Sequence, residues 1–433
     1  MRNTKKWGIF LIPLLVASVV LSACGSKDHL NNGASPSTDS STANSGQSGQ
    51  IVELTYWAPS WNEPFAPDII KEFEEQNPGI KVNVEYFPSE GMNEKYLLAL
   101  MNKTGPDIMD IAVDWTTPFA SSGGLLVLDD YIARDNVDLD DFWPGALKTI
   151  RVDGKVYALP YRSETHGLFY NKTLFEQAGL DPDGPKTWDD FLNAAQKITE
   201  NGGIGFAMVG KLSGDLSYQL INFIRSFGGD VLNEDNTRSL FDQPEAIKAV
   251  QFYVDMYKNK LTPDSTLSNV NTDNRNLFVS GNVGMFLSGV YDVDPIIQAN
   301  PAFEFGAAMY PYTPNIDRKL TLGGWNIVAT SYTKYSEEAW KFINFIASPE
   351  ISVRYSNTFS ARKSSIDNPK YQDELIRPFV NMLEYGIPMP PVPQITQIRD
   401  ILSNQVQQAM LGQVTVEEAM KAAAAEVNAL LQQ

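Results

Sequence analysis

Aromatic residues follow the ends of several apolar segments in this sequence, beside small or polar neighbours. Five of them are candidates for a binding site: Trp57, Trp61, Trp115, Tyr291 and Trp325. An aromatic ring can lie flat on the C–H face of a sugar, whose hydroxyl groups then point sideways toward polar side chains. The five aromatic residues therefore predict a site for a polyhydroxylated ligand, with packing in a core as the alternative for each ring.

Two glycines precede Trp325 in the segment TLGGWNIVAT, residues 321–330, which otherwise has the composition of a buried strand. Glycine weakens the interior of a strand, and it marks a bulge or a place where another group approaches the backbone. We therefore expect Gly323 and Gly324 to clear space for a ligand ring beside Trp325, and we include Gly324 in the predicted site.

Charged and polar side chains alternate after residue 160. Arg162, Glu164 and His166 stand at every second position, so in an extended segment they share one face. A carboxylate accepts two hydroxyl groups and a guanidinium donates in a fork, which suits a polyol. Arg162 also leaves an acidic sugar open as a ligand, because it can pair with a carboxylate. The alternative is a solvated strand edge with an internal ion pair.

Common catalytic and nucleotide-binding motifs are absent from the sequence, which has no HExxH, no P-loop and no GxSxG. It contains two histidines, one of which is His166, and a single cysteine. We therefore predict no enzyme, no cofactor and no metal site. The alternative from another class is a glycan-cleaving enzyme with Asp114 and Glu164 as acid and base, roughly 5 to 9.5 Å apart.

The N-terminus has the composition of a secretory signal followed by a linker. Basic residues precede the apolar residues 8–23, a stretch too short to span a membrane comfortably. It ends in LSAC, which resembles the bacterial lipobox, so we predict a signal peptide over residues 1–23 and lipidation of Cys24. Residues 24–50 are rich in Ser, Asn and Gly, and we predict a disordered tether. Because Cys24 is the only cysteine, an intramolecular disulfide is excluded.

The overall charge restricts the partners. The chain carries 52 acidic and 34 basic residues, a net charge of -18. Phosphate and anionic lipid would be repelled by such a surface, so we predict no nucleic-acid partner and no electrostatic adhesion to a membrane. Solubility is the simplest role for the charge.

From residue 51 onward, the hydrophobic pattern is that of an α/β protein. Residues 51–58 and 80–87 read as strands, residues 67–79 as the helix between them, and residues 106–113 as a third strand. A strand, a helix and a strand in succession form a βαβ unit, which implies parallel pairing and a right-handed crossover.

Helical patterns dominate the middle and the end of the chain, with strand segments on both sides of them. We predict helices over residues 187–199, 242–259, 336–348 and 416–433. Thr187 and Asp190 have the spacing of a capping box. Two α/β lobes, between which the chain passes more than once, account for this order, and ligands of such folds bind between domains.

Several stretches resemble the carbohydrate-binding family of bacterial solute-binding proteins, which serve ATP-driven sugar importers and include the maltodextrin-binding proteins. The stretches lie at residues 105–132, 153–191, 278–289, 321–328 and 412–431. The first begins with GPDIMDIAVDW, and the second contains both GKVYALP and LFYNKTLFEQAGL. The last three are FVSGNVGMFLSG, TLGGWNIV and the predicted helix GQVTVEEAMKAAAAEVNALL. These stretches occur in the order typical of the family, and the resemblance covers essentially everything after the tether.

The resemblance implies an α/β, two-lobe, periplasmic-binding-protein-like fold. Each lobe would be a mostly parallel sheet flanked by helices, with the ligand cleft between the lobes and closure about a hinge without catalysis. We predict an N-terminal lobe from residues 51–160 plus 310–365, and a C-terminal lobe from residues 161–309 plus 366–433.

Position by position, the resemblance implies roles for individual residues. Asp114 and Glu164 match acidic residues that bind hydroxyl groups, Tyr291 replaces a stacking tryptophan, and Trp325 is a frequent stacking platform. Asp292 follows Tyr291 and joins the predicted site.

The chain departs from the maltodextrin binders at Trp115, where they have arginine, and at Arg399, which lies near a C-terminal stacking aromatic. Both residues stay in the predicted site, and the departures make maltose a poor candidate.

The resemblance also implies the partners. We expect a sugar or oligosaccharide ligand, the transmembrane subunits of an ABC importer, and a monomer that a lipid on Cys24 holds at the extracellular face of the cell membrane, in a Gram-positive bacterium. The alternative within the same fold is a binder of a polyamine, a peptide or an anion.

Overall fold

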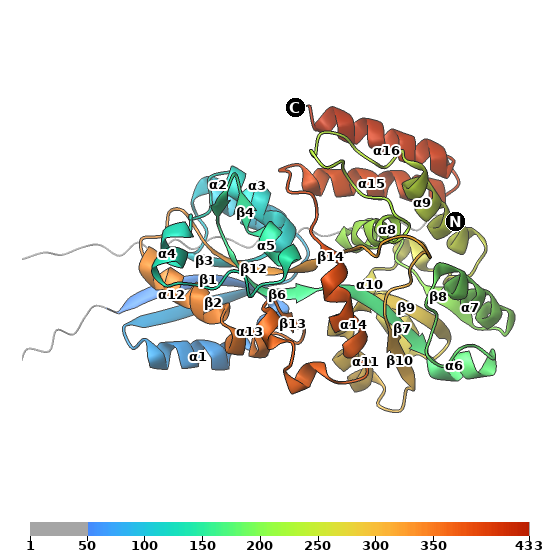
Figure 1. The fold of residues 1–433 in the computed structure, drawn as a ribbon, viewed down its shortest axis with the longest axis horizontal. Helices are drawn as coiled ribbons and strands as arrows, with labels where there is room; N and C mark the ends of the chain where they lie inside the picture. The colour runs from blue at the N-terminus through green and yellow to red at the C-terminus, as the bar shows by residue number, and fades with distance from the viewer. Residues whose placement is uncertain (1–50, 433) are drawn as a thin grey trace, which may run out of the picture. The chain divides into compact units, whose positions relative to one another are not determined.

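The computed structural model describes residues 51–432 (Figure 1). The signal peptide, the tether and the lipidation site Cys24 predicted above lie outside the described residues and stay predictions. Within residues 51–432, no helix has both the length and the apolar character needed to cross a membrane.

A six-stranded sheet forms the centre of the first lobe, with the strand order β13-β6-β12-β3-β1-β2. Its strands are β1 (Val52–Pro59), β2 (Ile80–Phe87), β3 (Ile108–Ala112), β6 (Leu159–Glu164), β12 (Gly323–Ala329) and β13 (Phe359–Ser360). β1 pairs in parallel with β2 and β3, which confirms the βαβ unit and the third strand predicted from the sequence.

A four-stranded sheet forms the centre of the second lobe, with the strand order β10-β7-β9-β8. Its strands are β7 (His166–Asn171), β8 (Ile204–Ala207), β9 (Val283–Gly289) and β10 (Phe305–Ala308). β8 and β9 are parallel, whereas β7 is antiparallel to β9 and β10.

Most strands of each sheet share one direction. The short edge strand β13 runs against it in the first sheet, and so do the two strands that follow a crossing, β12 in the first sheet and β7 in the second. β12 pairs antiparallel with both of its neighbours, as β7 does in the second sheet. Both strands begin where the chain has just crossed from the other lobe. They therefore start at the edge of their sheet where neighbouring strands such as β3 and β9 end, which forces the opposite direction.

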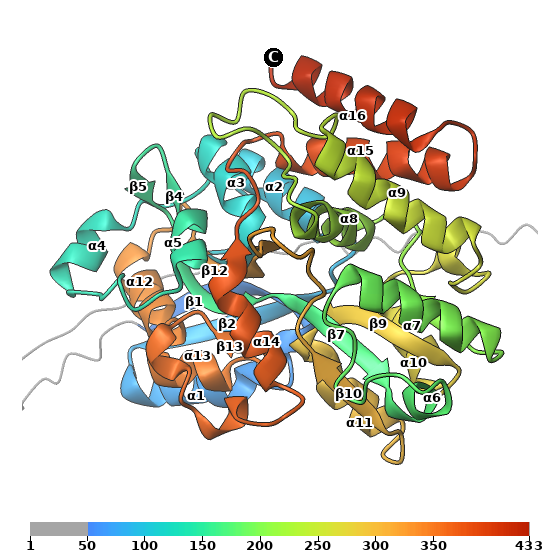
Figure 2. The same cartoon turned by 45° about the vertical axis from the view of Figure 1, so that its right-hand side comes forward.

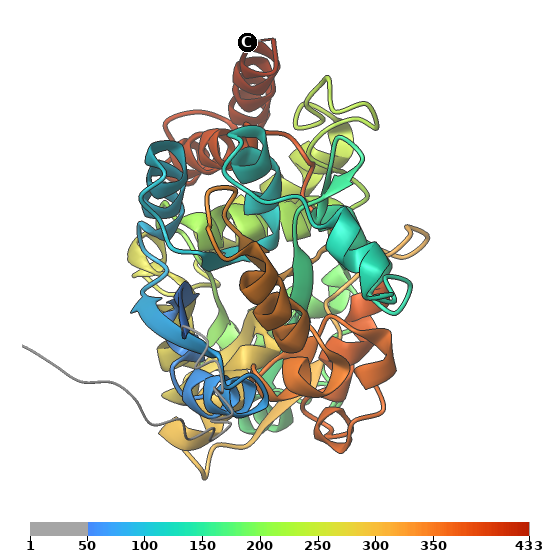
Figure 3. The same cartoon turned by 90° about the vertical axis from the view of Figure 1, so that its left-hand side faces the viewer.

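Helices cover both sheets (Figures 1 and 2). In the first lobe they are α1 (Ala66–Gln76), α2 (Met92–Asn102), α3 (Thr116–Ser121), α4 (Asp129–Arg134), α5 (Pro144–Thr149), α12 (Ser336–Ile346) and α13 (Pro349–Arg354). α1 and α12 lie side by side (Figure 3), where the rings of Phe73 and Phe342 pack edge to face with their centroids 5.0 Å apart.

The remaining helices belong to the second lobe or to the segment that leads into it: α6 (Lys172–Gln177), α7 (Trp188–Glu200), α8 (Gly214–Ser226), α9 (Pro244–Lys258), α10 (Asn271–Val279), α11 (Val293–Ala299), α14 (Arg377–Met382), α15 (Ile395–Met410) and α16 (Val416–Leu430). The capping box of Thr187 and Asp190 at the start of α7 is confirmed. In Figure 2, the C-terminal pair α15 and α16 (red) lies beside α9.

The chain passes between the two sheets at Thr165, the single residue that separates β6 from β7. Two further connections pass beside each other as short parallel strands, β11 (Leu320–Thr321) and β14 (Gly386–Ile387). Arg225 of α8 is buried beneath them and donates hydrogen bonds to the carbonyl groups of Ile387 and Pro388. A separate hairpin is formed by β4 (Arg151–Val152) and β5 (Lys155–Val156).

The lobe boundary that we predicted after residue 160 falls inside β6, because the strand stays in the first sheet until Glu164. The other lobe boundaries stay a prediction.

Candidate functional site

A cavity of about 270 Å³ lies where strands of both sheets end, and residues of both lobes line it. Eight of the residues predicted from the sequence are among them: Asp114, Trp115, Glu164, His166, Tyr291, Gly324, Trp325 and Arg399. The other four, Trp57, Trp61, Arg162 and Asp292, lie outside the lining. The cavity is thus assembled from the ends of β3, β6, β9 and β12, as the positions of the aromatic residues predict.

Trp325 is held between two other tryptophans at the first-lobe wall of the cavity. Its ring packs edge to face with Trp61, with centroids 5.0 Å apart and planes at 71°, and with Trp115, at 5.7 Å and 75°. Trp325 is 9% exposed, so only a small part of the ring is open. Edge-to-face packing fixes its orientation. Trp61 therefore supports the ring that lines the cavity, although it does not line the cavity itself.

Trp57 lies apart from the cavity. Side chains alternate between the two faces of a strand, and Trp57 projects opposite to the fully buried Tyr56 and Ala58. Its ring packs against Phe87 and Tyr96, with centroids 5.0 and 5.3 Å away. β1 continues to Pro59, so Trp57 lies inside the strand and not after its end, and its ring packs in the first lobe without lining the cavity.

The glycine pair serves the backbone as well as the cavity. Gly324 has φ +137°, and a Cβ atom there would lie 2.2 Å from the carbonyl oxygen of Arg162. β12 also has a register shift against β6 after Trp325. Gly324 is thus required by the close approach of β6, and it also lines the cavity. A Cβ at Gly323 would instead lie 3.1 Å from Glu164 Cγ and Tyr218 Oη, two residues of the cavity wall.

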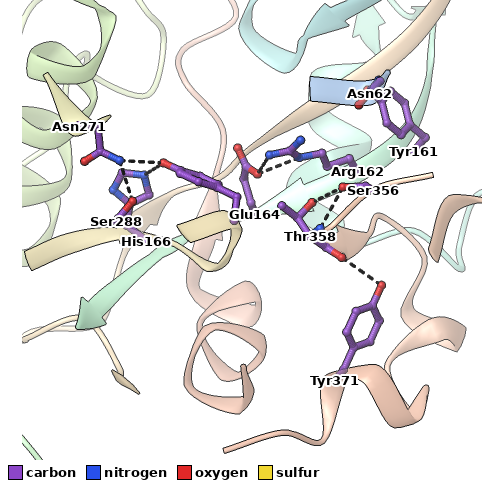
Figure 4. Close-up of polar contacts among 11 residues, drawn as sticks. Asn62, Tyr161, Arg162, Glu164, His166, Asn271, Ser288, Ser356, Thr358 and Tyr371 are labelled. Atoms are coloured by element: carbon purple, nitrogen blue, oxygen red, sulfur yellow. Dashed lines mark hydrogen bonds and ion pairs between the residues drawn. The ribbon is translucent and has the colours of Figure 1, made fainter. Parts of the chain in front are cut away.

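Arg162 and Glu164 form a buried ion pair beside the cavity (Figure 4). Arg162 Nε and Nη2 donate to Glu164 Oε2 at 2.9 and 2.6 Å. Arg162 is 5% exposed and lies outside the lining, so it orients Glu164. The internal ion pair of the alternative interpretation is present, but in a buried setting. Both of these hydrogen bonds go to Oε2, and Glu164 Oε1 accepts no hydrogen bond from the described residues.

His166, Tyr218 and Tyr291 form the second-lobe wall. His166 Nε2 and Tyr291 Oη are 3.1 Å apart, and the rings of His166 and Tyr218 have centroids 4.7 Å apart. Tyr218 donates to the carbonyl group of Thr321 at 2.8 Å. Burial lowers the pKa of His166 to about 3, so the imidazole is neutral at physiological pH. Burial also raises the pKa of Tyr291. These groups therefore act as neutral hydrogen-bonding partners.

Asp292 lies behind this wall and positions Asn271. Its carboxylate accepts hydrogen bonds from Arg275, at 2.9 Å, and from Ser288, at 2.5 Å. Asn271 Nδ2 lies 2.7 Å from Ser288 Oγ (Figure 4). The same nitrogen lies 3.4 Å from Asp292 Oδ2. Burial raises the pKa of Asp292, while Ser288 and Arg275 lower it. Asn271 lines the cavity, so Asp292 contributes through the amide that it fixes.

Arg399 and Asp114 join the two lobes. Arg399 of α15 donates from Nη1 to Asp114 Oδ2 at 2.5 Å, and Asp114 lies in a 3-10 turn directly after β3. On its own lobe, Arg399 donates to Ser217 Oγ at 3.0 Å and to the carbonyl group of Gly214 at 2.9 Å. Among the ion pairs of residues 51–432, this is the one that connects the two lobes.

Sequence reasoning missed several polar residues of the lining: Ser89, Asp215, Tyr218, Gln219 and Asn271. Four of them come from α8 and from the start of α10, whereas the sequence search followed the ends of strands. Polar residues in α8, which otherwise has many buried apolar positions, are the signal that could have found Tyr218 and Gln219. Within the described part of the chain, no group of three or more His, Cys, Asp or Glu residues could hold a metal ion.

Two α/β lobes joined by several crossings, with a cavity between them, define a solute-binding protein. Residues 58–352 match the profile of the family described as bacterial extracellular solute-binding protein, and the chain belongs to this family.

The chain is similar to an arabinooligosaccharide-binding protein of Bacillus subtilis (strain 168), with 25% identity over 349 residues, 79% of this chain and 76% of the relative. It is also similar to the solved structure of an ABC transporter solute-binding protein of Thermotoga lettingae TMO bound with alpha-D-tagatose. That similarity has 30% identity and a TM-score of 0.80, and it covers 88% of this chain and 100% of that one. A maltose-bound structure from T. maritima is 27% identical, with a TM-score of 0.79 and coverage of 88% and 100%. The predicted two-lobe fold is confirmed.

Proposed function

We propose that this chain is the sugar- or oligosaccharide-binding subunit of an ABC importer. The observation that carries the proposal is Trp325, a partly open ring fixed between Trp61 and Trp115 in a cavity that is otherwise rich in hydrogen-bonding groups. A sugar ring needs this combination of a rigid aromatic platform and polar neighbours. The relatives that bind arabinooligosaccharides, tagatose and maltose support the same class of ligand.

The ligand is an uncharged sugar. Glu164 accepts hydroxyl groups through its free Oε1, while the amide of Asn271 donates and accepts. Arg162, the cation that left an acidic sugar open, is buried against Glu164. Arg399 is likewise paired with Asp114. Both guanidinium groups already have a carboxylate partner, so neither is free to pair with an anionic ligand.

Binding closes the cleft. The ligand contacts both lobes only when they are together, so it stabilises the closed form by those additional contacts. The rotation is accommodated at Thr165 and at the crossing segments that β11 and β14 hold side by side. The transmembrane subunits of the importer then recognise the closed form.

The site binds and does not catalyse. The two carboxylates of the enzymatic alternative, Asp114 and Glu164, both accept hydrogen bonds from guanidinium groups. A general acid must instead hold a proton that it can donate. We therefore propose that the sugar leaves unchanged, and chromatography of an oligosaccharide recovered after prolonged incubation tests this point.

The chain acts as a monomer at the extracellular face of a Gram-positive cell membrane, tethered by residues 24–50 and a lipid on Cys24. The family is extracellular, which supports the location. Fractionation of cells that produce the wild type or Cys24→Ser tests the anchor: the variant should move from the membrane fraction to the medium.

The experiment that tests the main proposal is a titration of tryptophan fluorescence. The ligands are tagatose, maltose and arabinooligosaccharides, with putrescine, a dipeptide and glucuronate for the alternatives. We expect a saturable response to one sugar series and at least a tenfold loss of affinity in Trp325→Ala, about 1.4 kcal/mol or more. Trp143→Phe is the matched control, because Trp143 is part-buried and lies outside the cavity. A response to amine, peptide or anion, with no response to sugars, would exclude the proposal.

A further inference from the structure

Arg399 reaches from one wall of the cleft to the other. It is bonded to Gly214 and Ser217 at the start of α8 and to Asp114 on the opposite lobe. Arg399, Asp114 and Gly214 all line the cavity. A cleft between two lobes is open along its length, so a side chain that bonds to both walls closes it at that point.

The ion pair is largely removed from solvent. The side chain of Arg399 is 17% exposed and that of Asp114 is 9% exposed. Solvent therefore screens the attraction less than it screens a surface pair. The two groups come from different lobes, so opening the cleft must separate them, and the pair favours the closed form.

The size of the cavity agrees with a closed end. Its volume is about 270 Å³, slightly below the roughly 300 to 1,000 Å³ that is usual for small-molecule sites. A chain of three or more sugar rings needs more room along the cleft than this cavity offers, and Arg399 and Asp114 are among the residues that limit the cavity.

We propose that Arg399 determines ligand length: by pairing with Asp114 across the cleft, it closes one end of the cavity and restricts the ligand to one or two uncharged sugar rings. This inference rests on the proposed function and makes it more specific. It assigns Arg399 a positioning role, since the residue fixes Asp114 and the separation of the lobes.

The first measurement compares sugars of increasing length in the full chain. Calorimetry is carried out on the wild type, Arg399→Ala and Arg354→Gln. The ligands are arabinose and its linear oligomers, and glucose with the series from maltose to maltotetraose. Arg354 is the matched control, because it pairs with Glu72 on the surface of the first lobe. We expect the wild type to lose at least tenfold in affinity from the disaccharide to the trisaccharide, and Arg399→Ala to lose less than threefold.

Equal affinity of the wild type for disaccharide and tetrasaccharide would overturn the inference. So would an unchanged length preference in Arg399→Ala.

The second measurement needs no ligand. Spin labels at Asp130 and Lys197, which are exposed on α4 and α7 of the two lobes, report the distance between the lobes in the ligand-free protein with Cys24→Ser. We expect Arg399→Gln to lower the closed fraction at least threefold relative to Arg354→Gln. No difference between the variants, or a wild type that is entirely open, would overturn the role of the pair in closure. If no sugar binds the wild type, the proposed function and the length preference both fail, while this distance still decides whether the ion pair closes the cleft.

Discussion

The carboxyl group of Asp110 gives the sharpest test of the electrostatics behind the site. Asp110 lies in β3 and is fully buried. Its Oδ2 accepts hydrogen bonds from Tyr56 Oη at 2.6 Å, Asn62 Nδ2 at 2.9 Å and Tyr161 Oη at 3.1 Å. Burial raises the pKa of Asp110 to about 7, although these hydrogen bonds and the nearby Arg162 lower it. Asn62 and Tyr161 of this network appear in Figure 4.

The sign and size of the effect follow from linkage. The unfolded chain has an Asp pKa of about 3.9. The folded protein therefore binds the proton more tightly, and this contribution to stability is fully present below about pH 4 and is lost as the pH rises toward 7. With these two pKa values, the loss in the free energy of unfolding between pH 5 and pH 8 is about 2.5 kcal/mol.

Asp110→Asn removes this titration and keeps a side-chain oxygen as an acceptor. We expect the difference in the free energy of unfolding, wild type minus variant, to fall by about 2.5 kcal/mol from pH 5 to pH 8. Urea unfolding at several pH values in this range measures it, with Asp130→Asn as a control on the exposed surface of α4. A difference that stays constant across the range would refute the reasoning, because Asp110 would then not titrate near pH 7 in the folded protein.

Two further predictions concern the cavity. Gly324→Ala should lower the free energy of unfolding by about 2–4 kcal/mol, because the added Cβ meets the Arg162 carbonyl oxygen and φ is +137°. Gly202→Ala is the control, because Gly202 has φ +88° but an added Cβ there would meet no other atom. We expect it to lower the free energy of unfolding by about 1 kcal/mol, measured by thermal unfolding. Equal losses of stability in the two variants would contradict the argument. Sugar affinity should change by less than about twofold between pH 5 and pH 8, because His166 with a pKa of about 3 stays neutral there. A transition near pH 6.5 that His166→Gln abolishes would contradict this.

The sequence determined the features that depend on neighbouring residues. The order of strand, helix and strand over residues 51–87 predicted the parallel pairing of β1 and β2. The spacing of Thr187 and Asp190 predicted the cap of α7. Aromatic and acidic residues after strand ends predicted much of the cavity wall, because strands of one direction end at the same edge of a sheet. Each of these signals depends on residues that are close in the sequence, and the rule that strands of one direction end at the same edge holds for α/β sheets in general.

Tertiary structure decided which of these residues lie in the wall. Trp57 and Trp115 both stand near strand ends in the sequence, yet Trp57 lies inside β1 and packs against Phe87 and Tyr96, whereas Trp115 follows β3 and lines the cavity. Tyr218 and Asn271 reach the wall from helices that carry no strand-end signal. Arg399 and Asp114 are 285 residues apart in the chain. Their pairing depends on where α15 docks beside α8 and on how far the two lobes close, and neither is encoded within a few residues of either side chain.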